Sequence, residues 1–202
     1  MTGRGVDQVL PCPCAPQIHE CATRSANEYV QLAERANGRI LRPVGFEYPW
    51  GAALDELRLA VPGICIVNLE TAITRSEAFL PKGINYRMSP ENAQCLASAG
   101  INCCVLANNH VLDWGEAGLV DTLDNLRKLG IQAVGAGRNA VEAQSPAILT
   151  IDQNRRLIVF AVASVTSGIP KNWAATENSP GLNLLPELSD ASALRIARQI
   201  EA

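Results

Sequence analysis

Residues 103–113 read CCVLANNHVLD, an apolar run that ends in two asparagines and a histidine, with an aspartate three residues later. A second apolar run, residues 64–67 (ICIV), leads in the same way into Asn68 and Glu70. Short runs that are apolar at every position are typical of strands buried on both faces of a sheet. The two segments therefore predict two buried strands, each followed by a polar loop.

Helical segments alternate with these strands along the chain. Apolar spacing, N-cap residues and terminal glycines predict helices at residues 25–36, 89–100 and 116–129. Two further apolar runs predict strands at residues 131–134 and 157–164. Strands that alternate with helices indicate an α/β fold, whose sheet is largely parallel and covered on both sides.

Length and charge narrow the class of protein. A chain of 202 residues favours one domain, residues 1–202. Seventeen Lys and Arg residues against twenty Asp and Glu give a net charge of −3, which argues against nucleic-acid binding. The longest apolar run, residues 157–165, is too short to span a bilayer, and residues 1–6 do not resemble a signal peptide. The sequence as written therefore predicts a cytoplasmic protein without an integral membrane segment.

Polar side chains follow the first two predicted strands, where open α/β sheets gather their functional sites. If the strands are parallel neighbours, their loops bring together one carboxylate, three amides and an imidazole, with a second carboxylate one turn later. These residues are Asn68, Glu70, Asn108, Asn109, His110 and Asp113. Such side chains suit divalent metals such as Mg²⁺, Mn²⁺ or Zn²⁺, and a bound metal could activate water. The structural alternative is that the asparagines form Asx turns and that Asp113 caps the next helix.

Two other motifs suggest different chemistry. Residues 135–140 read GAGRNA and match a dinucleotide-binding pattern, but no acidic residue follows about 20 positions later. Cys12, Cys14 and Cys21 lie near His19 and could bind zinc, although their spacing is not that of common zinc sites.

The remaining cysteines lie in apolar segments, where a thiol behaves as a small hydrophobic side chain. They are Cys65, Cys95, Cys103 and Cys104. Catalysis by a Cys–His pair would require Cys103 or Cys104 to leave the core, so all four are predicted to be core residues.

Four motifs in order resemble the CapA-type capsule-synthesis family, also called poly-γ-glutamate biosynthesis proteins. They are VNLE at residues 67–70, NYRM at 85–88, ANNHVLDWG at 107–115 and GAG at 135–137. The resemblance runs from Gly3 to about Leu185. It implies a calcineurin-like metallophosphoesterase fold, in which mixed sheets are flanked by helices. It also implies a bacterial protein of capsule or poly-γ-glutamate biosynthesis or processing, with a hydrolase-type site.

The resemblance also implies roles for individual residues. Glu70 and Asn109 would bind a divalent metal, whether Mn²⁺, Mg²⁺, Zn²⁺ or iron. His110 and Asp113 would be catalytic residues. Arg87 would bind a carboxylate or phosphate of the substrate, with Asn68 and Asn108 as further substrate-binding residues. The substrate would be an anionic polymer or a small phosphoester or amide.

The sequence departs from the family pattern at both ends. The family's opening Gly-Asp-Val-Met strand, which carries the first metal-binding aspartate, has no counterpart before Gly3, and two later histidine motifs are absent. We therefore expect a truncated chain that holds metal weakly and is inactive alone. A non-catalytic polymer-binding component and an inactive remnant are the alternatives. A missing first strand would also expose a sheet edge through which the chain could self-associate.

Overall fold

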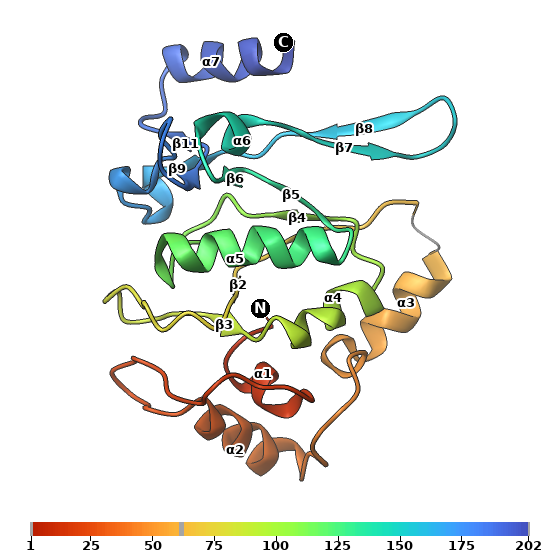
Figure 1. Ribbon diagram of the computed structural model, residues 1–202. Helices are drawn as coiled ribbons and strands as arrows, with labels where there is room; N and C mark the ends of the chain where they lie inside the picture. The colour runs from red at the N-terminus through yellow and green to blue at the C-terminus, as the bar shows by residue number, and fades with distance from the viewer. Residues whose placement is uncertain (1, 61–62, 202) are drawn as a thin grey trace.

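The central element is a three-stranded parallel sheet. The computed structural model describes residues 2–60 and 63–201 (Figure 1). Strands β1 (Ile66–Asn68), β4 (Cys103–Val105) and β5 (Gln132–Val134) lie in the order β1-β4-β5. Both pairings are parallel, with Val67 opposite Cys104 and Cys104 opposite Ala133. The three short strands and their parallel arrangement are confirmed.

The two faces of this sheet are covered differently. Cys104 belongs to the main core, which includes Leu119 and Leu126 of helix α5 (Gly115–Lys128). Cys103 points to the other face, because neighbouring strand residues alternate in direction. There it packs with Leu149 of the hairpin formed by β7 (Ala147–Thr150) and β8 (Arg156–Val159). One helix and one hairpin thus cover both faces of β4, as a strand apolar on both faces requires. The edge strand β1 is exposed at Ile66 and Asn68, so the prediction of a buried strand at residues 64–67 is wrong.

The predicted helices form, with one change of geometry. Helix α2 (Ala26–Asn37) starts with a capping box between Ser25 and Glu28 and ends before Gly38. The segment predicted at 89–100 begins as the 3₁₀ turn η2 (Glu91–Ala93) and continues as α4 (Gln94–Ser98). The Ser89 hydroxyl accepts the Asn92 N–H at 3.2 Å, so serine caps this segment as its position before proline predicts.

Shorter elements complete the fold. Strands β2 and β3 pair in parallel, β6 and β10 antiparallel, and β9 and β11 in parallel. In chain order the elements not yet given are α1 (Gly5–Val9), η1 (Tyr48–Trp50), α3 (Ala52–Ala60), β2 (Ala72–Ile73), β3 (Arg87–Met88), β6 (Ala136–Gly137), α6 (Ala140–Gln144), β9 (Ala163–Ser164), η3 (Val165–Ser167), η4 (Lys171–Trp173), β10 (Gly181–Leu182), β11 (Leu184–Leu185) and α7 (Asp190–Glu201). Within the described ranges no helix is long and apolar enough to cross a membrane.

The prediction of one buried strand over residues 157–164 is wrong. Strand β8 ends at Val159, and β9 is a separate strand paired with β11. Along β8 the burial alternates, and the Ile158 side chain is 57% exposed. The β7–β8 hairpin is covered on one face only, so every second residue is exposed and the others are buried in β7 and partly buried in β8. An apolar run without alternation cannot reveal this arrangement.

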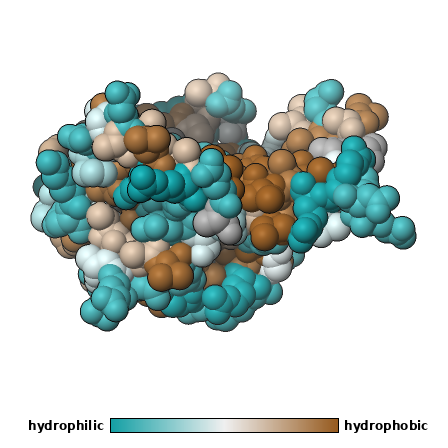
Figure 2. All heavy atoms as spheres, turned by 90° about the horizontal axis from the view of Figure 1, so that it is seen from above, coloured by the Kyte–Doolittle hydropathy of each residue, from teal (hydrophilic) through white to brown (hydrophobic). Residues whose placement is uncertain are grey.

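The uncovered face of the hairpin forms part of an apolar cleft. Ile148 and Ile158 are cross-strand partners on this face. Together with Phe160, Val141 of α6 and Ile200 of α7 they line a cleft of about 760 Å³. Figure 2, which looks at the molecule from above, shows hydrophobic side chains gathered on this side of the surface. The hairpin therefore contributes one face to the core and presents the other to solvent.

Candidate functional site

The loops that follow β1 and β4 are joined through Asn108. Its side-chain amide donates to the Asn68 Oδ1 atom at 3.1 Å and to the Leu69 carbonyl at 3.0 Å. Its own Oδ1 accepts the His110 N–H at 3.0 Å, which is an Asx turn. Asn68 in turn donates to Glu70 at 2.9 Å. The two strand-end loops therefore meet as their parallel arrangement predicts, and Asn108 has the structural role offered as the alternative.

His110 and Asp113 form a buried pair at the next turn of the chain. The His110 Nδ1 atom lies 2.9 Å from Asp113 Oδ2, and the Asp113 side chain is 0% exposed. The same Oδ2 atom accepts the Tyr86 N–H at 2.6 Å, and the Tyr86 ring packs on the imidazole with centroids 4.2 Å apart. No described residue bonds His110 Nε2, so this atom remains available for chemistry.

The alternative that Asp113 caps the following helix is wrong. The N-cap of α5 is Trp114, and no side chain caps that helix end. The Asp113 carboxylate instead accepts hydrogen bonds from the Tyr86 N–H and from Lys82, which both lie outside α5. The buried Asp113 carboxylate therefore binds His110, Tyr86 and Lys82 and does not cap the start of α5.

Lys82 is a member of this cluster that the sequence analysis missed. Its Nζ atom lies 2.7 Å from Asp113 Oδ1 and 3.5 Å from His110 Nδ1, and it donates to the Asn109 carbonyl. The lysine side chain is 25% exposed. The only sequence signal for it is the Pro81-Lys82-Gly83 turn three residues before the NYRM motif. We call Lys82, Asn109, His110 and Asp113 the lysine–histidine cluster.

Asn85 attaches the loop that carries Lys82 to Asp113. Its side-chain amide donates to the Leu80 carbonyl at 3.0 Å and to the Asp113 carbonyl at 2.9 Å. The Leu80 N–H also donates to the Asp113 carbonyl, at 2.9 Å. The NYRM motif thus supplies Asn85 and Tyr86 to this site. Of the residues in this motif, only Arg87 was predicted to have a site role.

Arg87 has other partners than the lysine–histidine cluster. Its Nη1 atom donates to the Ser76 carbonyl at 2.7 Å and to Glu77 Oε1 at 2.9 Å. The guanidinium carbon lies 3.9 Å from the centre of the Trp114 ring, and the residue is 6% exposed. These contacts favour a structural role, and substrate binding by Arg87 stays a prediction.

Comparison with known families gives this geometry a context. The family described as bacterial capsule synthesis protein PGA_cap matches residues 1–202. The chain belongs to this family. Membership confirms the resemblance to CapA-type proteins, and the mixed α/β architecture agrees with the family's calcineurin-like type.

Named relatives of this PGA_cap chain share its sequence to different extents. A probable polyglutamine synthesis accessory protein of Mycobacterium tuberculosis is 47% identical over 186 residues, covering 92% of this chain and 49% of the relative. The PGA biosynthesis protein CapA of Bacillus subtilis is 27% identical over 117 residues, covering 57% of this chain and 30% of the relative. The capsule biosynthesis protein CapA of Bacillus anthracis is 28% identical over 108 residues, covering 53% and 25%. The chain spans about half the length of the mycobacterial relative.

Few donors for the predicted metal are without partners among the residues that the structure describes. The free donors at the strand ends are Glu70 Oε2, the Asn109 side chain and His110 Nε2, while Asp113 is paired with Lys82. Among residues 2–60 and 63–201, no group of three or more His, Cys, Asp or Glu side chains is placed to hold a metal. Metal binding by Glu70 and Asn109 stays a prediction, and no chemical step is assigned to it.

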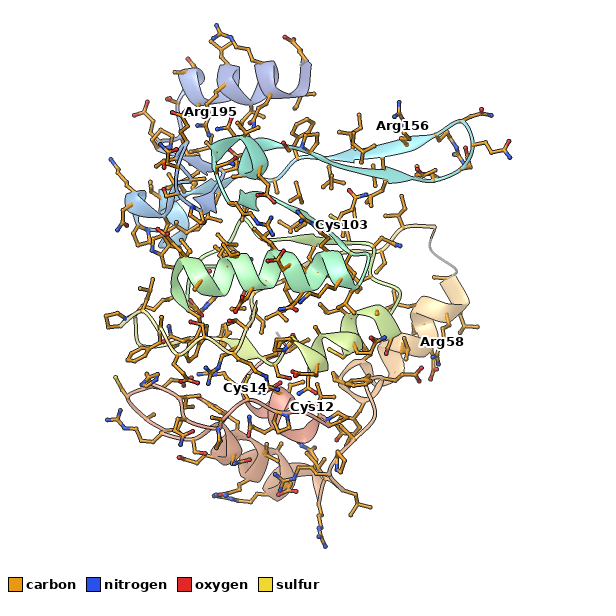
Figure 3. All side chains as sticks on the ribbon, in the orientation of Figure 1. Cys12, Cys14, Arg58, Cys103, Arg156 and Arg195 are labelled. Carbon is orange, nitrogen blue, oxygen red and sulfur yellow. The ribbon has the colours of Figure 1, made fainter. Side chains whose placement is uncertain are left out.

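The predicted alternative zinc site does not form from the described cysteines. Cys14 is buried and its thiol donates to the Thr74 carbonyl at 3.6 Å, whereas Cys12 and Cys21 are exposed. The His19 ring stacks on Phe79 with centroids 3.5 Å apart. Figure 3 labels Cys12 and Cys14 close to α1, away from Cys103 on the sheet.

The GAGRNA segment and the core cysteines have structural explanations. Gly135 adopts a φ of +88°, and a Cβ on Gly137 would lie 2.3 Å from the Ala143 backbone nitrogen. The glycines therefore permit a turn and close packing of α6, which has only five residues. Cys103 and Cys104 are both 0% exposed, and burial raises the pKa of their thiols to about 11 and about 12. These cysteines are core residues, as predicted.

Proposed function

We propose that this PGA_cap chain serves as an accessory component in the biosynthesis or processing of a glutamate-based anionic polymer. The observation that carries the proposal is the 47% identity, over 92% of the chain, to a relative named as a polyglutamine synthesis accessory protein. Of two further relatives named CapA, one is named for PGA biosynthesis and one for capsule biosynthesis. The chain spans about half of the mycobacterial relative, so we propose this role for the whole protein to which these 202 residues correspond.

The strand-end loops supply groups that suit such a polymer. A glutamate polymer presents carboxylates and amide groups at regular intervals. Lys82 offers a partly exposed ammonium group, while Asn68 and Asn109 offer amides that can both donate and accept hydrogen bonds. Asn68 and Asn109 lie at the carboxyl ends of β1 and β4, and Lys82 of the β2–β3 loop contacts the Asn109 carbonyl, so an extended anionic chain could contact these groups in succession.

Hydrolysis of the polymer is a second candidate, favoured by one observation. His110 holds Asp113 through Nδ1 and leaves Nε2 free of partners in the described structure. An imidazole fixed in this way can transfer a proton to or from a reacting group. In this case His110 is the proton-transfer residue and Asp113 orients it.

The experiment is a binding titration of the full 202-residue chain with defined poly-γ-glutamate oligomers, measured by isothermal titration calorimetry. We expect Asn68→Ala to weaken binding about tenfold, the effect of about 1.4 kcal/mol that two charge-assisted contacts can supply. Asn154→Ala at the tip of the hairpin is the matched control and should bind like the wild type. Binding that is absent, or equal in both variants, contradicts the proposal.

A turnover assay on the same oligomers separates the two candidates. If the chain hydrolyses the polymer, His110→Ala should lower turnover while binding remains, because proton transfer contributes in the transition state. Binding without turnover in the wild type, with and without added Mn²⁺, identifies a binding component.

Self-association through a sheet edge is part of the same proposal. Strand β1 is an edge of the parallel sheet, and no other described strand pairs with its outer side. Ile66 on this edge is 37% exposed. Unpaired edges can pair with another chain, so we expect concentration-dependent dimers that Ile66→Lys weakens. Sedimentation velocity measures this, and a strict monomer contradicts it.

A further inference from the structure

Helices α1 and α2, residues 40–48 and one residue of β3's approach enclose a cavity of about 400 Å³. The two helices lie side by side at the N-terminal end of the molecule (Figure 1). The wall of the cavity is formed largely by aliphatic side chains and three tyrosines, among them Val9, Val30, Ile40, Tyr29, Tyr48 and Tyr86. We call this cavity the tyrosine pocket. A concave, mostly apolar cavity of this size is typical of sites that bind small molecules.

The charged groups at the tyrosine pocket are paired within the protein. Arg4 donates from Nε to Glu20 Oε1 at 2.5 Å and from Nη2 to the Tyr29 hydroxyl at 2.9 Å. The Tyr29 hydroxyl in turn donates to Glu20 Oε2 at 2.5 Å. Glu20 is 6% exposed, so its carboxylate neutralises the guanidinium group where water is largely excluded. A charged ligand would lose its hydration without gaining an opposite charge, and the pocket therefore favours an uncharged ligand.

Arg4 holds two of the tyrosine rings in place. Its guanidinium carbon lies 4.4 Å from the centre of the Tyr29 ring and 4.9 Å from the centre of the Tyr86 ring, within the range of cation–π contacts. The backbone of Arg4 has a φ of +54°, which is rare for a residue with a side chain, and such strained positions cluster where proteins hold ligands. The aromatic walls are thus ordered before a ligand arrives, which lowers the cost of binding.

The lining also offers polar groups that are uncharged. The hydroxyls of Tyr48 and Tyr86 form no hydrogen bond with the residues that the structure describes. A tyrosine hydroxyl can both donate and accept, so these groups can orient a ligand that carries one neutral polar group. Aromatic rings pack on one another in offset or edge-to-face contacts, so three tyrosines favour a flat aromatic ligand.

We propose that the tyrosine pocket binds a small, uncharged aromatic compound that carries a hydrogen-bonding group, such as a phenol or an aromatic amine. The Tyr86 ring, which lines the pocket, also packs on His110 with centroids 4.2 Å apart. The bound compound would therefore lie next to the lysine–histidine cluster. The inference goes beyond the proposed polymer function and does not depend on it.

The test is a fluorescence titration of the full 202-residue chain with N-phenyl-1-naphthylamine, an uncharged aromatic amine whose emission rises in apolar surroundings. Ala33→Phe on α2 adds a ring at a position that lines the pocket and should weaken binding about tenfold or more. Ala36→Phe makes the same change at an exposed position of α2 outside the lining and should bind like the wild type. The dye 1-anilinonaphthalene-8-sulfonate has the same rings with a negative charge and should bind about tenfold more weakly than the uncharged dye.

A further control addresses the apolar cleft of the hairpin, which could also take up a dye. Ile158→Ser alters that cleft and should leave unchanged the binding that Ala33→Phe weakens. Equal binding by the wild type and Ala33→Phe overturns the proposal, as does an equal loss in Ile158→Ser or equally tight binding of the sulfonated dye. Dimers that Ala33→Phe dissociates in sedimentation velocity would assign the pocket to a second copy of the chain and overturn the proposal too.

A second variant decides the matter if Ala33→Phe does not unfold cooperatively in urea. Tyr48 is 51% exposed, so Tyr48→Ala should leave the fold intact while removing one aromatic wall. We expect it to weaken binding of the uncharged dye about fivefold, and unchanged binding overturns the proposal. No polymer is used, so this result is independent of the proposed function.

Discussion

Two buried aspartates in different regions of the molecule are held in opposite ways. Asp7 of α1 is 1% exposed and accepts hydrogen bonds from the Cys14 N–H at 2.7 Å, the Ser89 N–H at 3.0 Å and the Asn92 side chain at 2.7 Å. Asp113 is 0% exposed and binds the ammonium group of Lys82 and the imidazole of His110. One carboxylate has neutral donors as its hydrogen-bond partners, whereas the other has a cation and a titratable ring.

The difference shows that burial alone does not mark a functional carboxylate. The partners of Asp7 come from two segments, so its carboxylate joins the N-terminal helix to residues 14 and 89–92. Burial, its largest influence, raises the pKa of Asp7 despite these donors. Asp113 instead pairs with Nδ1 of an imidazole, whose Nε2 has no partner among the described residues, and with a partly exposed lysine. The partners, and not the residue type, distinguish the structural region from the candidate site.

The largest effect should come from Asp113→Asn. The substitution removes the negative charge that faces Lys82 and places an amide against the Tyr86 N–H or the imidazole. Breaking a buried ion pair from one side typically costs about 3 kcal/mol or more, so we expect a fall of this size in the free energy of unfolding. Urea denaturation measures it, with the exposed Asp55→Asn as control. A fall in the free energy of unfolding below about 1 kcal/mol would show that the ion pair between Asp113 and Lys82 does not stabilise the fold.

Asp7→Asn should have the next largest effect. An asparagine keeps one acceptor oxygen but turns an amide group toward one of the three donors, which leaves a buried N–H unsatisfied. Such a group costs about 2 kcal/mol, so the denaturation midpoint should fall by less than in Asp113→Asn. The resonances of His110 should not shift, because Asp7 belongs to the other region. A His110 shift in this variant would mean that the two regions are coupled.

A smaller effect of the Asp7 carboxylate should depend on pH. Because burial raises the pKa of Asp7 above its ordinary value of 3.8, the folded state holds that proton more tightly than the unfolded state. The stability from Asp7 is therefore fully present below pH 3.8 and is lost as the pH rises through the folded pKa. The advantage of the wild type over Asp7→Asn in unfolding free energy should shrink over this range. An advantage that grows with pH would mean that the hydrogen bonds outweigh burial.

The sequence was sufficient to predict the sheet and the meeting of its loops. Residues 103–107 are apolar throughout because both faces of the sheet are covered at β4, and this pattern is visible without a structure. The flanking segments 64–67 and 131–134 form strands as well, although β1 and β5 each have exposed residues. Parallel pairing then places Asn68 beside Asn108, as their hydrogen bond confirms. The apolar run at 157–164 was misleading, because a hairpin covered on one side and a separate strand can have the same composition.

The partners of the two aspartates could not be predicted in the same way. Lys82 reaches Asp113 across 31 positions of sequence, and Asp7 reaches Asn92 across 85. Neither contact leaves a periodic pattern, since each depends on how an irregular loop folds over another element. The loop that carries Lys82 is positioned by the Asn85 amide, a contact that residue spacing does not encode. Local sequence patterns therefore predicted the strands and loops that form the site, but not the position of Lys82 within it.

The smallest effect should come from Arg58→Ala, which tests whether distance or burial makes an ion pair stabilising. Arg58 on α3, labelled in Figure 3, lies 2.6 Å from Glu47, as close as Lys82 lies to Asp113. Both side chains are more than half exposed, so water and salt screen the pair, and ordering two flexible side chains offsets the attraction. We expect Arg58→Ala to change the free energy of unfolding by less than about 0.5 kcal/mol, and added salt to change it no further. Parallel urea titrations of Arg58→Ala and Asp113→Asn make the comparison directly. Equal losses in the two variants would contradict it, because burial would then add nothing to an ion pair of the same length.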